Sequence, residues 1–358
     1  MKIARKLSLL IGKIFAVFII SLFVLNFLNH YEIFSVDTRL AGFDYLPPLV
    51  LLILALPVSL GFVLLKKRWA GLIFLVVVIL FFITLGDVSM RFVTTKSLDK
   101  EAGYEKLSVL TYNVRYYSFG IEKIADFLDE THADVYLLCE SVLDEQRKNY
   151  LEENLPEYSL ISDNGHDTAI LSRHPVLRYE IVQLPSFLAS LSGSNDLEEL
   201  TRKNQHRAFV HAVIDLNGTP VNVLSVRLIA GRAKDKSIKE SYKWGRYLLQ
   251  AQEQEQQTFL NYISKLNGPI VFGGDLNAPS SARVIKNFRK IARDAYLSDH
   301  LFGNFTFRTN MPSMRLDYIF HTPDLITVDS KIIRTRLSDH FPVKCDLLVP
   351  RTSSLAFK

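Results

Sequence analysis

Several polar residues that could bind a metal ion or transfer a proton share one position, at or near the end of a predicted strand. They are Asn113, Glu140, Asp275, Asn277, Asp317, Asp339 and His340. Each is ambiguous alone, because Asp-x-Asn after a strand often forms a turn and an Asp-His pair often caps a loop. A buried carboxylate such as Asp317 needs a cation, a hydrogen-bond donor or a metal ion beside it. Their recurrence through one chain favours a catalytic site.

Short β-rich runs supply the strands that would position these residues. The Asn217-Gly218 pair between two of the runs predicts a hairpin turn. Apolar spacing predicts helices over 121–129, 237–266 and 281–291, and turn signals over 186–204 predict an inserted loop. We expect strands over 106–114, 134–139, 158–162, 169–172, 176–184, 208–216, 221–228, 269–273, 316–320, 328–334 and 343–349.

Hairpins mixed with helices argue against a purely parallel, doubly wound sheet. Two mostly antiparallel sheets packed together, with helices over their outer faces, fit the pattern better. No Pro/Gly/Ser-rich linker interrupts the chain after the polar segment 91–105. We therefore expect residues 106–350 to form one large domain, with 91–105 as its tether.

The first quarter of the chain is far more apolar than the rest. Its apolar stretches lie over 7–28, 46–65 and 71–85, and a helix that spans a bilayer needs about 20 residues. We predict a membrane anchor with about three transmembrane helices over residues 1–90. The alternative is a cleaved signal peptide followed by buried helices, although no small-residue cleavage site follows the first stretch.

Lys and Arg are distributed unevenly around these predicted spans. The N-terminal tail and the turn at 66–68 are basic, whereas the loop at 29–45 holds one Arg and three acids. Because positively charged segments stay in the cytoplasm, three crossings place the chain after Arg91 on the other side. The sequence thus predicts a multi-pass membrane protein with its large domain on the extracytoplasmic side.

Composition excludes several classes of protein. The 358 residues are 48% hydrophobic and 22% charged, with a net charge of +5 and two cysteines. These values exclude a disordered chain, a fibrous repeat, a disulfide-rich domain and a strongly basic nucleic-acid-binding protein. Cys139 and Cys345 cannot build a cysteine-rich zinc site and are expected to be packed core residues.

Taken in order, the motifs resemble those of the endonuclease/exonuclease/phosphatase superfamily, the deoxyribonuclease- and exonuclease III-like metal phosphoesterases. The resemblance covers about residues 106–349. It implies an α+β fold, a four-layered αββα sandwich, here preceded by the three predicted transmembrane helices. The motifs that carry it are Thr111-Tyr112-Asn113, Leu138-Cys139-Glu140, Ala169-Ile170-Leu171-Ser172-Arg173, Gly274-Asp275-Leu276-Asn277, Leu316-Asp317-Tyr318 and Ser338-Asp339-His340.

The resemblance implies a metal site. Glu140, with Asn113 nearby and Asp339 close to the ion, would hold Mg²⁺ or Mn²⁺ through oxygen atoms, the ligand type that these ions prefer. The ion would neutralise the substrate phosphate and stabilise the leaving oxygen.

The resemblance also implies how the ester is cleaved. Asp275 would position or deprotonate the attacking water, and Asn277 would hydrogen-bond a phosphate oxygen. His340, oriented by Asp317, would donate to a non-bridging or leaving oxygen. Water would attack in line, without a covalent enzyme intermediate.

One position departs from the family pattern. The family usually shows a His, or in some branches a Tyr, at the end of the strand over 221–228, where this chain has Arg227. Arginine cannot act as a general acid, although its fork can clamp a phosphate. Either Arg227 substitutes electrostatically, or His206 or His211 takes over, or activity is impaired. Arg173 is a further candidate for binding the substrate phosphate, with a solvated turn as the alternative.

The expected substrate is a phosphate ester presented by the lipid bilayer. Residues 91–358 hold 34 Lys/Arg and 33 Asp/Glu, whereas nucleases normally carry a basic footprint. Nucleic acid is therefore possible but not favoured, and the predicted tether favours a lipid phosphate or a phospholipid head group. A membrane-anchored nuclease ranks second, and a catalytically silent phosphate-binding module ranks third. The sequence indicates no protein partner.

Overall fold

The computed structural model describes residues 103–185, 207–230, 238–280, 282–296, 305–308 and 314–351, with the single residues 21 and 76. The described residues of 91–277 and 287–358 belong to one compact unit. The predicted transmembrane stretches, most of the tether and the predicted loop at 186–204 lie outside the described residues, Ser21 and Val76 apart. Within the described part, no helix is long and apolar enough to cross a membrane.

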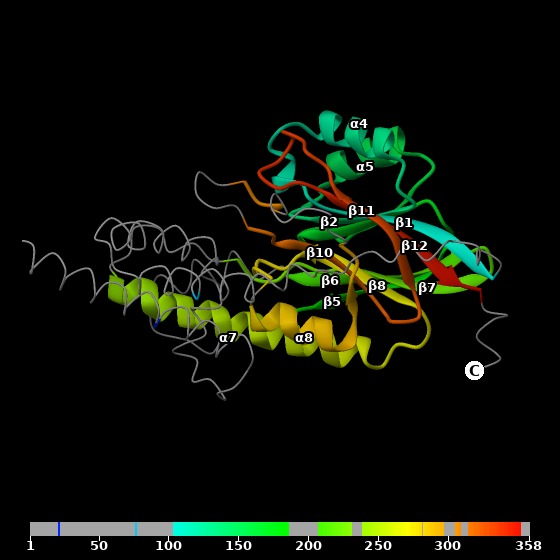
Figure 1. The fold of residues 1–358 in the computed structure, drawn as a ribbon. Coiled ribbons are helices and arrows are strands. Elements are labelled where there is room, and N and C mark those ends of the chain that lie inside the picture. Colours follow the sequence, from blue (N-terminus) through cyan, green and yellow to red (C-terminus); the bar gives the residue numbers. More distant parts are fainter. Residues whose placement is uncertain are drawn as a thin grey trace, which may run out of the picture. The chain divides into compact units, whose positions relative to one another are not determined.

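Two six-stranded sheets pack face to face in the described part of the chain (Figure 1). The first has the order β11-β12-β1-β2-β4-β3, with β1 (Tyr104–Asn113), β2 (Val135–Cys139), β3 (Ser159–Ile161), β4 (Thr168–Ser172), β11 (Ile326–Ile332) and β12 (Val343–Pro350). The second has the order β5-β6-β7-β8-β10-β9, with β5 (Val176–Gln183), β6 (Ala208–Leu216), β7 (Thr219–Ser225), β8 (Ile270–Asp275), β9 (Arg293–Asp294) and β10 (Asp317–His321).

Strand direction is mixed in both sheets. Neighbouring strands are antiparallel except in the pairs β1–β2 and β7–β8, which are parallel. The expectation of two mostly antiparallel sheets is confirmed, with one parallel pair in each. These two pairs matter below, because the carboxyl ends of parallel neighbours meet at the same edge of a sheet.

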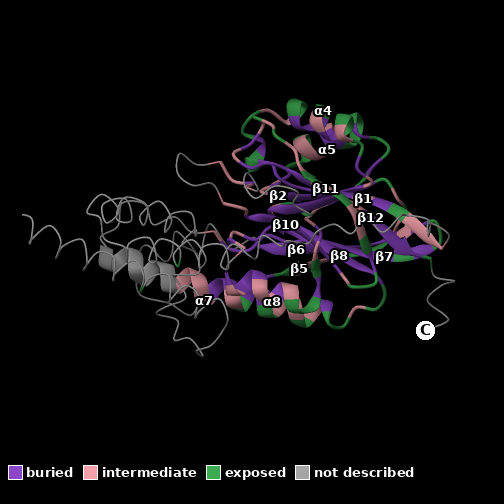
Figure 2. Ribbon diagram, in the orientation of Figure 1, coloured by how far each residue is buried: buried purple, intermediate pink, exposed green. Residues whose placement is uncertain are grey.

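Helices cover the outer face of each sheet. α4 (Ile121–Thr131) and α5 (Glu145–Asn154) pack on the first sheet. α7 (Ile238–Ile263) and the end of α8 (Arg283–Ile291) that carries Phe288 pack on the second. Figure 2 shows that burial is concentrated in the strands, whereas exposed residues lie on the outer faces of the helices, in the connecting segments and on the edge strands β5 and β11. The result is the expected sandwich of two sheets between helices.

Alternating side chains explain how a strand can be buried on both faces. Val210, Ala212 and Ile214 of β6 belong to the apolar cluster between the two sheets. Phe209, one residue before Val210, points the other way and packs against Phe259 of α7, with ring centroids 5.0 Å apart. This pattern produces the nearly continuous apolar run of β6.

The predicted hairpin between β6 and β7 is confirmed. Asn217 and Gly218 have φ values of 52° and 87°, a left-handed backbone that Asn and Gly tolerate. β7 ends earlier than predicted, at Ser225, although the chain continues beside β8. There the Val226 N–H still donates to the carbonyl of Gly273, at 2.9 Å.

Three described elements were not predicted from the sequence: the 3-10 helix over Arg115–Tyr117, α5 and β9. α5 buries only Leu151, so it has no apolar stripe, and its local signal is the cap in which the Asp144 side chain accepts from the Arg147 N–H. β9 has two residues and forms by pairing with β10. None of the three has enough buried apolar spacing to be recognised by periodicity.

Candidate active site

The carboxyl ends of the two parallel pairs face each other across the sandwich. Asn113 ends β1 and Glu140 follows β2 in the first sheet, while Asp275 ends β8 and Arg227 follows β7 in the second. Nδ2 of Asn113 donates to Oδ2 of Asp275 at 2.9 Å, which joins the two sheets at this edge. Most of the residues proposed from the sequence meet here.

Two glycines allow these strand ends to approach. A Cβ on Gly274, whose φ is +150°, would lie 1.8 Å from the carbonyl oxygen of Val226. A Cβ on Gly273 would lie 2.5 Å from the carbonyl oxygen of Tyr318. The Gly-Gly pair before Asp275 is therefore required by backbone packing on two sides.

Cys139 fills the space beside this approach. Its Sγ accepts a hydrogen bond from the Asp275 N–H at 3.3 Å, and the residue is fully buried. Burial raises the pKa of the Cys139 thiol, and of the equally buried Cys345 thiol, well above the usual value. The expectation that both cysteines are packed core residues is confirmed.

The Asp275-x-Asn277 motif is a turn and part of the site at once. Oδ1 of Asp275 accepts the Asn277 N–H at 3.0 Å, an Asx-turn, while Oδ2 bonds Asn113. Asn277 has a φ of 49°, and its Nδ2 donates to the carbonyl of Leu228 at 2.9 Å. The turn thereby fixes the orientation of both side chains.

His340 lies between two buried aspartates. Its Nδ1 is 2.8 Å from Oδ2 of Asp317, and its Nε2 is 3.9 Å from Oδ2 of Asp275. Asp317 and Asp275 are directly opposite each other on β10 and β8. Ser338 holds the preceding turn, because its hydroxyl accepts the His340 N–H and donates to the carbonyl of Asn113.

The charges of this group shift two pKa values. Burial by itself would lower the pKa of His340, but the neighbouring Asp317 and Asp275 raise it to about 9. Burial, reinforced by the charge of Asp317, raises the pKa of the Asp275 carboxyl above its usual value. His340 therefore carries its proton at neutral pH and can donate from Nε2.

Glu140 and Arg227 form a buried ion pair with a third residue. Nη2 of Arg227 donates to Oε1 of Glu140, and Nη1 donates to Oδ2 of Asp167, both at 2.6 Å. Burial would lower the pKa of the Arg227 guanidinium, but Asp167 and Glu140 raise it, so the charge is retained. The guanidinium thus contacts two carboxylates at once.

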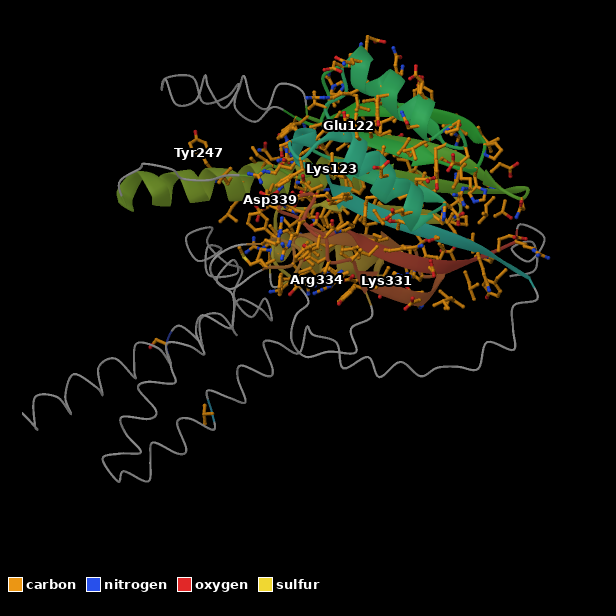
Figure 3. The ribbon with its side chains drawn as sticks, turned by 90° about the horizontal axis from the view of Figure 1, so that it is seen from above. Glu122, Lys123, Tyr247, Lys331, Arg334 and Asp339 are labelled. Carbon is orange, nitrogen blue, oxygen red and sulfur yellow. The ribbon has the colours of Figure 1, made fainter. Side chains whose placement is uncertain are left out.

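Asp339 lies at the more exposed side of the group, on the segment between β11 and β12 (Figure 3). Its Oδ2 is 3.6 Å from Nε of Arg115, and its side chain is 25% exposed. Arg308 donates from its backbone N–H to the carbonyl of Asp339 and from its guanidinium to the carbonyl of Ser338.

A left-handed turn after β1 forms hydrogen bonds to both Asn113 and Glu140. Arg115, Tyr116 and Tyr117 have φ values of 48°, 54° and 59°, a conformation that costs non-glycine residues roughly 1–2 kcal/mol each. The turn is held because the Arg115 N–H donates to Oδ1 of Asn113 and the Tyr116 N–H to the carbonyl of Glu140. Such strain is typical of functional sites.

Two residues proposed as contributors, Arg173 and His211, lie away from this group. Arg173 lies at the other end of β2 and β4, where its N–H donates to the carbonyl of Asp134 and its guanidinium donates to the Tyr158 hydroxyl. His211 packs under α7 against Tyr262 and cannot replace Arg227. His206 lies outside the described residues.

Sequence reasoning missed Asp167. It stands just before β4, at a position that the sequence analysis did not single out. Since β4 is antiparallel to β2, with Thr168 opposite Cys139, the start of β4 lies beside the end of β2. An acid immediately before an apolar strand was the available signal.

The charge balance of the group fits a divalent cation. Arg227, Arg115 and protonated His340 are the cationic side chains that ion-pair with its carboxylates among the described residues. The carboxylates outnumber them, and Oδ1 of Asp317 is buried without a hydrogen-bond partner there. The carboxylates are Glu140, Asp167, Asp275, Asp317 and Asp339.

Geometry also brings ligand atoms of Asp275, Asp317 and His340 within 4.8 Å of one another. Because His340 keeps its proton in this setting, these three residues suit proton transfer better than metal binding. Glu140 and Asp339, the carboxylates predicted to hold the ion, are not in this group of three.

Comparisons with solved structures agree with this fold. A D. rerio TDP2 humanized by 14 mutations has 18% identity and a TM-score of 0.51, covering 68% of this chain and 98% of that one. A Bacteroides vulgatus endonuclease/exonuclease/phosphatase has 15% identity and a TM-score of 0.51, covering 68% and 99%. D. rerio TDP2 complexed with a single-strand DNA product has 17% identity and a TM-score of 0.50, covering 68% and 98%.

Sequence comparison gives the family. No curated protein matched the chain. The profile of the Endonuclease/Exonuclease/phosphatase family matches residues 110–340, which contain Asn113, Glu140, Asp275 and His340. The chain therefore belongs to the endonuclease/exonuclease/phosphatase family and is a hydrolase that acts on phosphoester bonds.

Proposed function

We propose that the protein is a membrane-anchored, divalent-metal-dependent phosphoesterase that hydrolyses a phosphomonoester or phosphodiester by in-line attack of water. The observation that carries this proposal is the Asp317–His340–Asp275 arrangement beside Glu140. It supplies a proton acceptor, a proton donor and a carboxylate for a cation at one edge of the sandwich.

The residues of the chain divide the reaction between them. Asp275 accepts a proton from the attacking water, since its raised pKa makes it a stronger base than an exposed aspartate. His340 donates from Nε2 to a phosphate or leaving oxygen, and Asp317 fixes its ring through Nδ1. Asn277 hydrogen-bonds a phosphate oxygen.

Glu140 and Asp339, with the amide oxygen of Asn113, would hold the cation. A bound Mg²⁺ or Mn²⁺ would neutralise the phosphate and stabilise the leaving oxygen. Oδ1 of Asn113 already accepts the Arg115 N–H, but an amide oxygen has a second lone pair.

The favoured substrate is a lipid phosphate or a phospholipid head group. This preference rests on the predicted anchor over residues 1–90, which would concentrate membrane lipids at the site, and on the nearly neutral charge of residues 91–358. The proposed location is a multi-pass membrane protein with the catalytic domain on the extracytoplasmic side.

A nuclease is the second candidate, because D. rerio TDP2 forms a complex with a single-strand DNA product on a similar fold. A silent phosphate-binding module is the third, because Arg227 stands where the family usually has a His. Both candidates must bind phosphate, so an assay of hydrolysis is needed to distinguish them.

The test is a hydrolysis panel on the full chain in detergent micelles. Substrates are a lipid phosphate monoester, a phospholipid, and single- and double-stranded DNA, each with EDTA, Mg²⁺ or Mn²⁺. We expect lipid phosphate release that EDTA abolishes and Mg²⁺ or Mn²⁺ restores, and that His340→Ala lacks. Turnover that survives exhaustive chelation would overturn the metal assignment. Cleavage of DNA alone would overturn the substrate assignment.

A further inference from the structure

We propose that Arg227, held in place by Asp167, is a built-in counter-cation of Glu140 that sets how strongly the site binds a divalent metal ion. The inference rests on the proposed function and deepens it. It concerns two residues of this chain, one of which departs from the family pattern and one of which was not predicted at all.

The contacts of Arg227 fix the position of its charged guanidinium. Its two terminal nitrogens bond Glu140 and Asp167 at 2.6 Å each, and the Arg227 residue is only 8% exposed. Its backbone is fixed as well, since its carbonyl accepts from Nη2 of Arg207 at 2.8 Å. Arg207 in turn forms a buried ion pair with Glu255.

Asp167 and Glu140 are also linked through the backbone. The N–H of Ser141, the residue after Glu140, donates to the carbonyl of Asp167 at 3.1 Å. Their side chains are linked as well, because both carboxylates accept a hydrogen bond from Arg227. Asp167 thus acts on Glu140 through the guanidinium and is a positioning residue, with no contact to Glu140 of its own required.

The arrangement leaves Oε2 as the Glu140 oxygen most open to a metal ion. Oε1 accepts from Arg227, whereas Oε2 accepts no hydrogen bond from the described residues. A cation bound there lies beside a fixed positive charge, and a like charge opposes binding more strongly when water is excluded. Asp167 cancels part of this opposition, because its carboxylate is bonded to the same guanidinium.

Phosphate clamping alone does not explain this geometry. A guanidinium that waits for phosphate would present its fork to the open site. Here each terminal nitrogen is bonded to a carboxylate, and Nε is buried without a partner among the described residues. The contacts therefore indicate a role toward Glu140 and its cation.

Charge balance predicts effects of opposite sign. Arg227→Met removes the positive charge and leaves two carboxylates, so Mn²⁺ should bind about tenfold more tightly. Asp167→Asn leaves the guanidinium less neutralised, so Mn²⁺ should bind about tenfold more weakly. The double variant restores the net charge and should return within about threefold of wild type. A purely structural role would weaken binding in all three.

The experiment is a Mn²⁺ titration of the full chain in detergent micelles. Binding is measured by calorimetry and by the electron spin resonance signal of free Mn²⁺. Arg227→Lys keeps the charge and should stay within about threefold of wild type, which separates charge from fold if Arg227→Met unfolds. Glu140→Gln should weaken Mn²⁺ binding in every background.

Asp294→Asn is the matched control. Asp294 is another largely buried aspartate side chain bonded by arginines, Arg315 and Arg289, and it belongs to β9. It removes the same charge outside the site and should leave Mn²⁺ affinity unchanged. Equal shifts in this control and in Asp167→Asn, or shifts of the same sign in Arg227→Met and Asp167→Asn, would overturn the inference.

The hydrolysis panel decides the proposed function separately. Mn²⁺ affinities that change as expected, in a chain that cleaves no phosphate ester, would overturn the proposed function and support the inference. Mn²⁺ binding to neither wild type nor Arg227→Met would overturn the inference, whatever the panel shows.

Discussion

Nδ2 of Asn113 donates a 2.9 Å hydrogen bond to Oδ2 of Asp275, across the interface between the two sheets. The bond connects the end of one parallel strand pair to the end of the other, so the site depends on the packing of the whole sandwich. It also holds a carboxylate that burial makes unfavourable to ionise. We therefore expect the Asp275 carboxylate to be needed for activity but to lower the stability of the fold.

Asp275→Asn tests this conflict. The substitution removes the proposed proton acceptor, so kcat should fall by about 10³-fold or more. It also removes a buried negative charge that faces Asp317, so the Tm of the metal-free protein should rise by a few degrees. Thermal unfolding in EDTA and single-substrate kinetics measure the two effects.

Asn113→Ala is the control for that prediction. It leaves the Asp275 charge in place but removes the donor that satisfies it, and it should lower the Tm. A lower Tm for Asp275→Asn, equal to that of Asn113→Ala, would show that the carboxylate stabilises the fold.

His340 predicts a pH dependence of stability. Its folded pKa, about 9, is above the ordinary value of 6.5, so binding its proton favours the folded state. This contribution, up to about 3 kcal/mol, is complete below pH 6.5 and is lost as the pH rises through 9. The free energy of unfolding in EDTA should differ more between wild type and His340→Gln at pH 6 than at pH 10. A constant difference would contradict the shift.

Asp317→Asn should move the pH profile of the enzyme. Asp317 is the nearest charge that raises the pKa of His340, so its loss should lower that pKa. The alkaline limb of kcat/KM should shift to lower pH by about one unit, with a loss of about 10²-fold at the optimum. A reduced rate with an unchanged alkaline limb would show that another group controls the profile.

The predicted membrane orientation can be tested independently of chemistry. A reporter that is active only outside the cytoplasm should be active when fused after Lys358, because three crossings follow a basic N-terminus. The matched fusion carries a reporter that works only in the cytoplasm and should be silent. The reverse pattern would contradict the predicted topology.

Strand runs and motif order were sufficient to predict the sandwich, because apolar alternation and the Asn217-Gly218 turn act locally. α5 was missed since its single buried residue, Leu151, leaves no periodic signal. The pairing of β1 with β2 and of β7 with β8 is a property of the packed sheets, and no local pattern in the sequence indicates it.

The site was predictable where a polar residue interrupts an apolar strand end. Asp275 follows this rule at the end of β8, whereas Asp317 lies at the start of β10 and His340 before β12, and the structure brings the three together. Arg173 follows it too but lies at the opposite end of its strands, because β4 is antiparallel to β2. The same reversal brings Asp167 into the site. Strand direction, which the sequence does not specify, explains both outcomes.

Gly274→Ala gives the most direct test of how the strand ends approach. The added Cβ would lie 1.8 Å from the Val226 carbonyl oxygen, which is backbone and cannot rotate away. The substitution should cost several kcal/mol and prevent assembly of the Asp275 end of β8.

Gly268→Ala is the matched control, since Gly268 has a φ of +83° but a Cβ added there would meet no atom within 4 Å. It should cost only about 1–2 kcal/mol, the strain of a left-handed alanine. Chemical denaturation of both variants distinguishes the effects, and equal losses would show that backbone strain, and not the contact with Val226, explains the glycine.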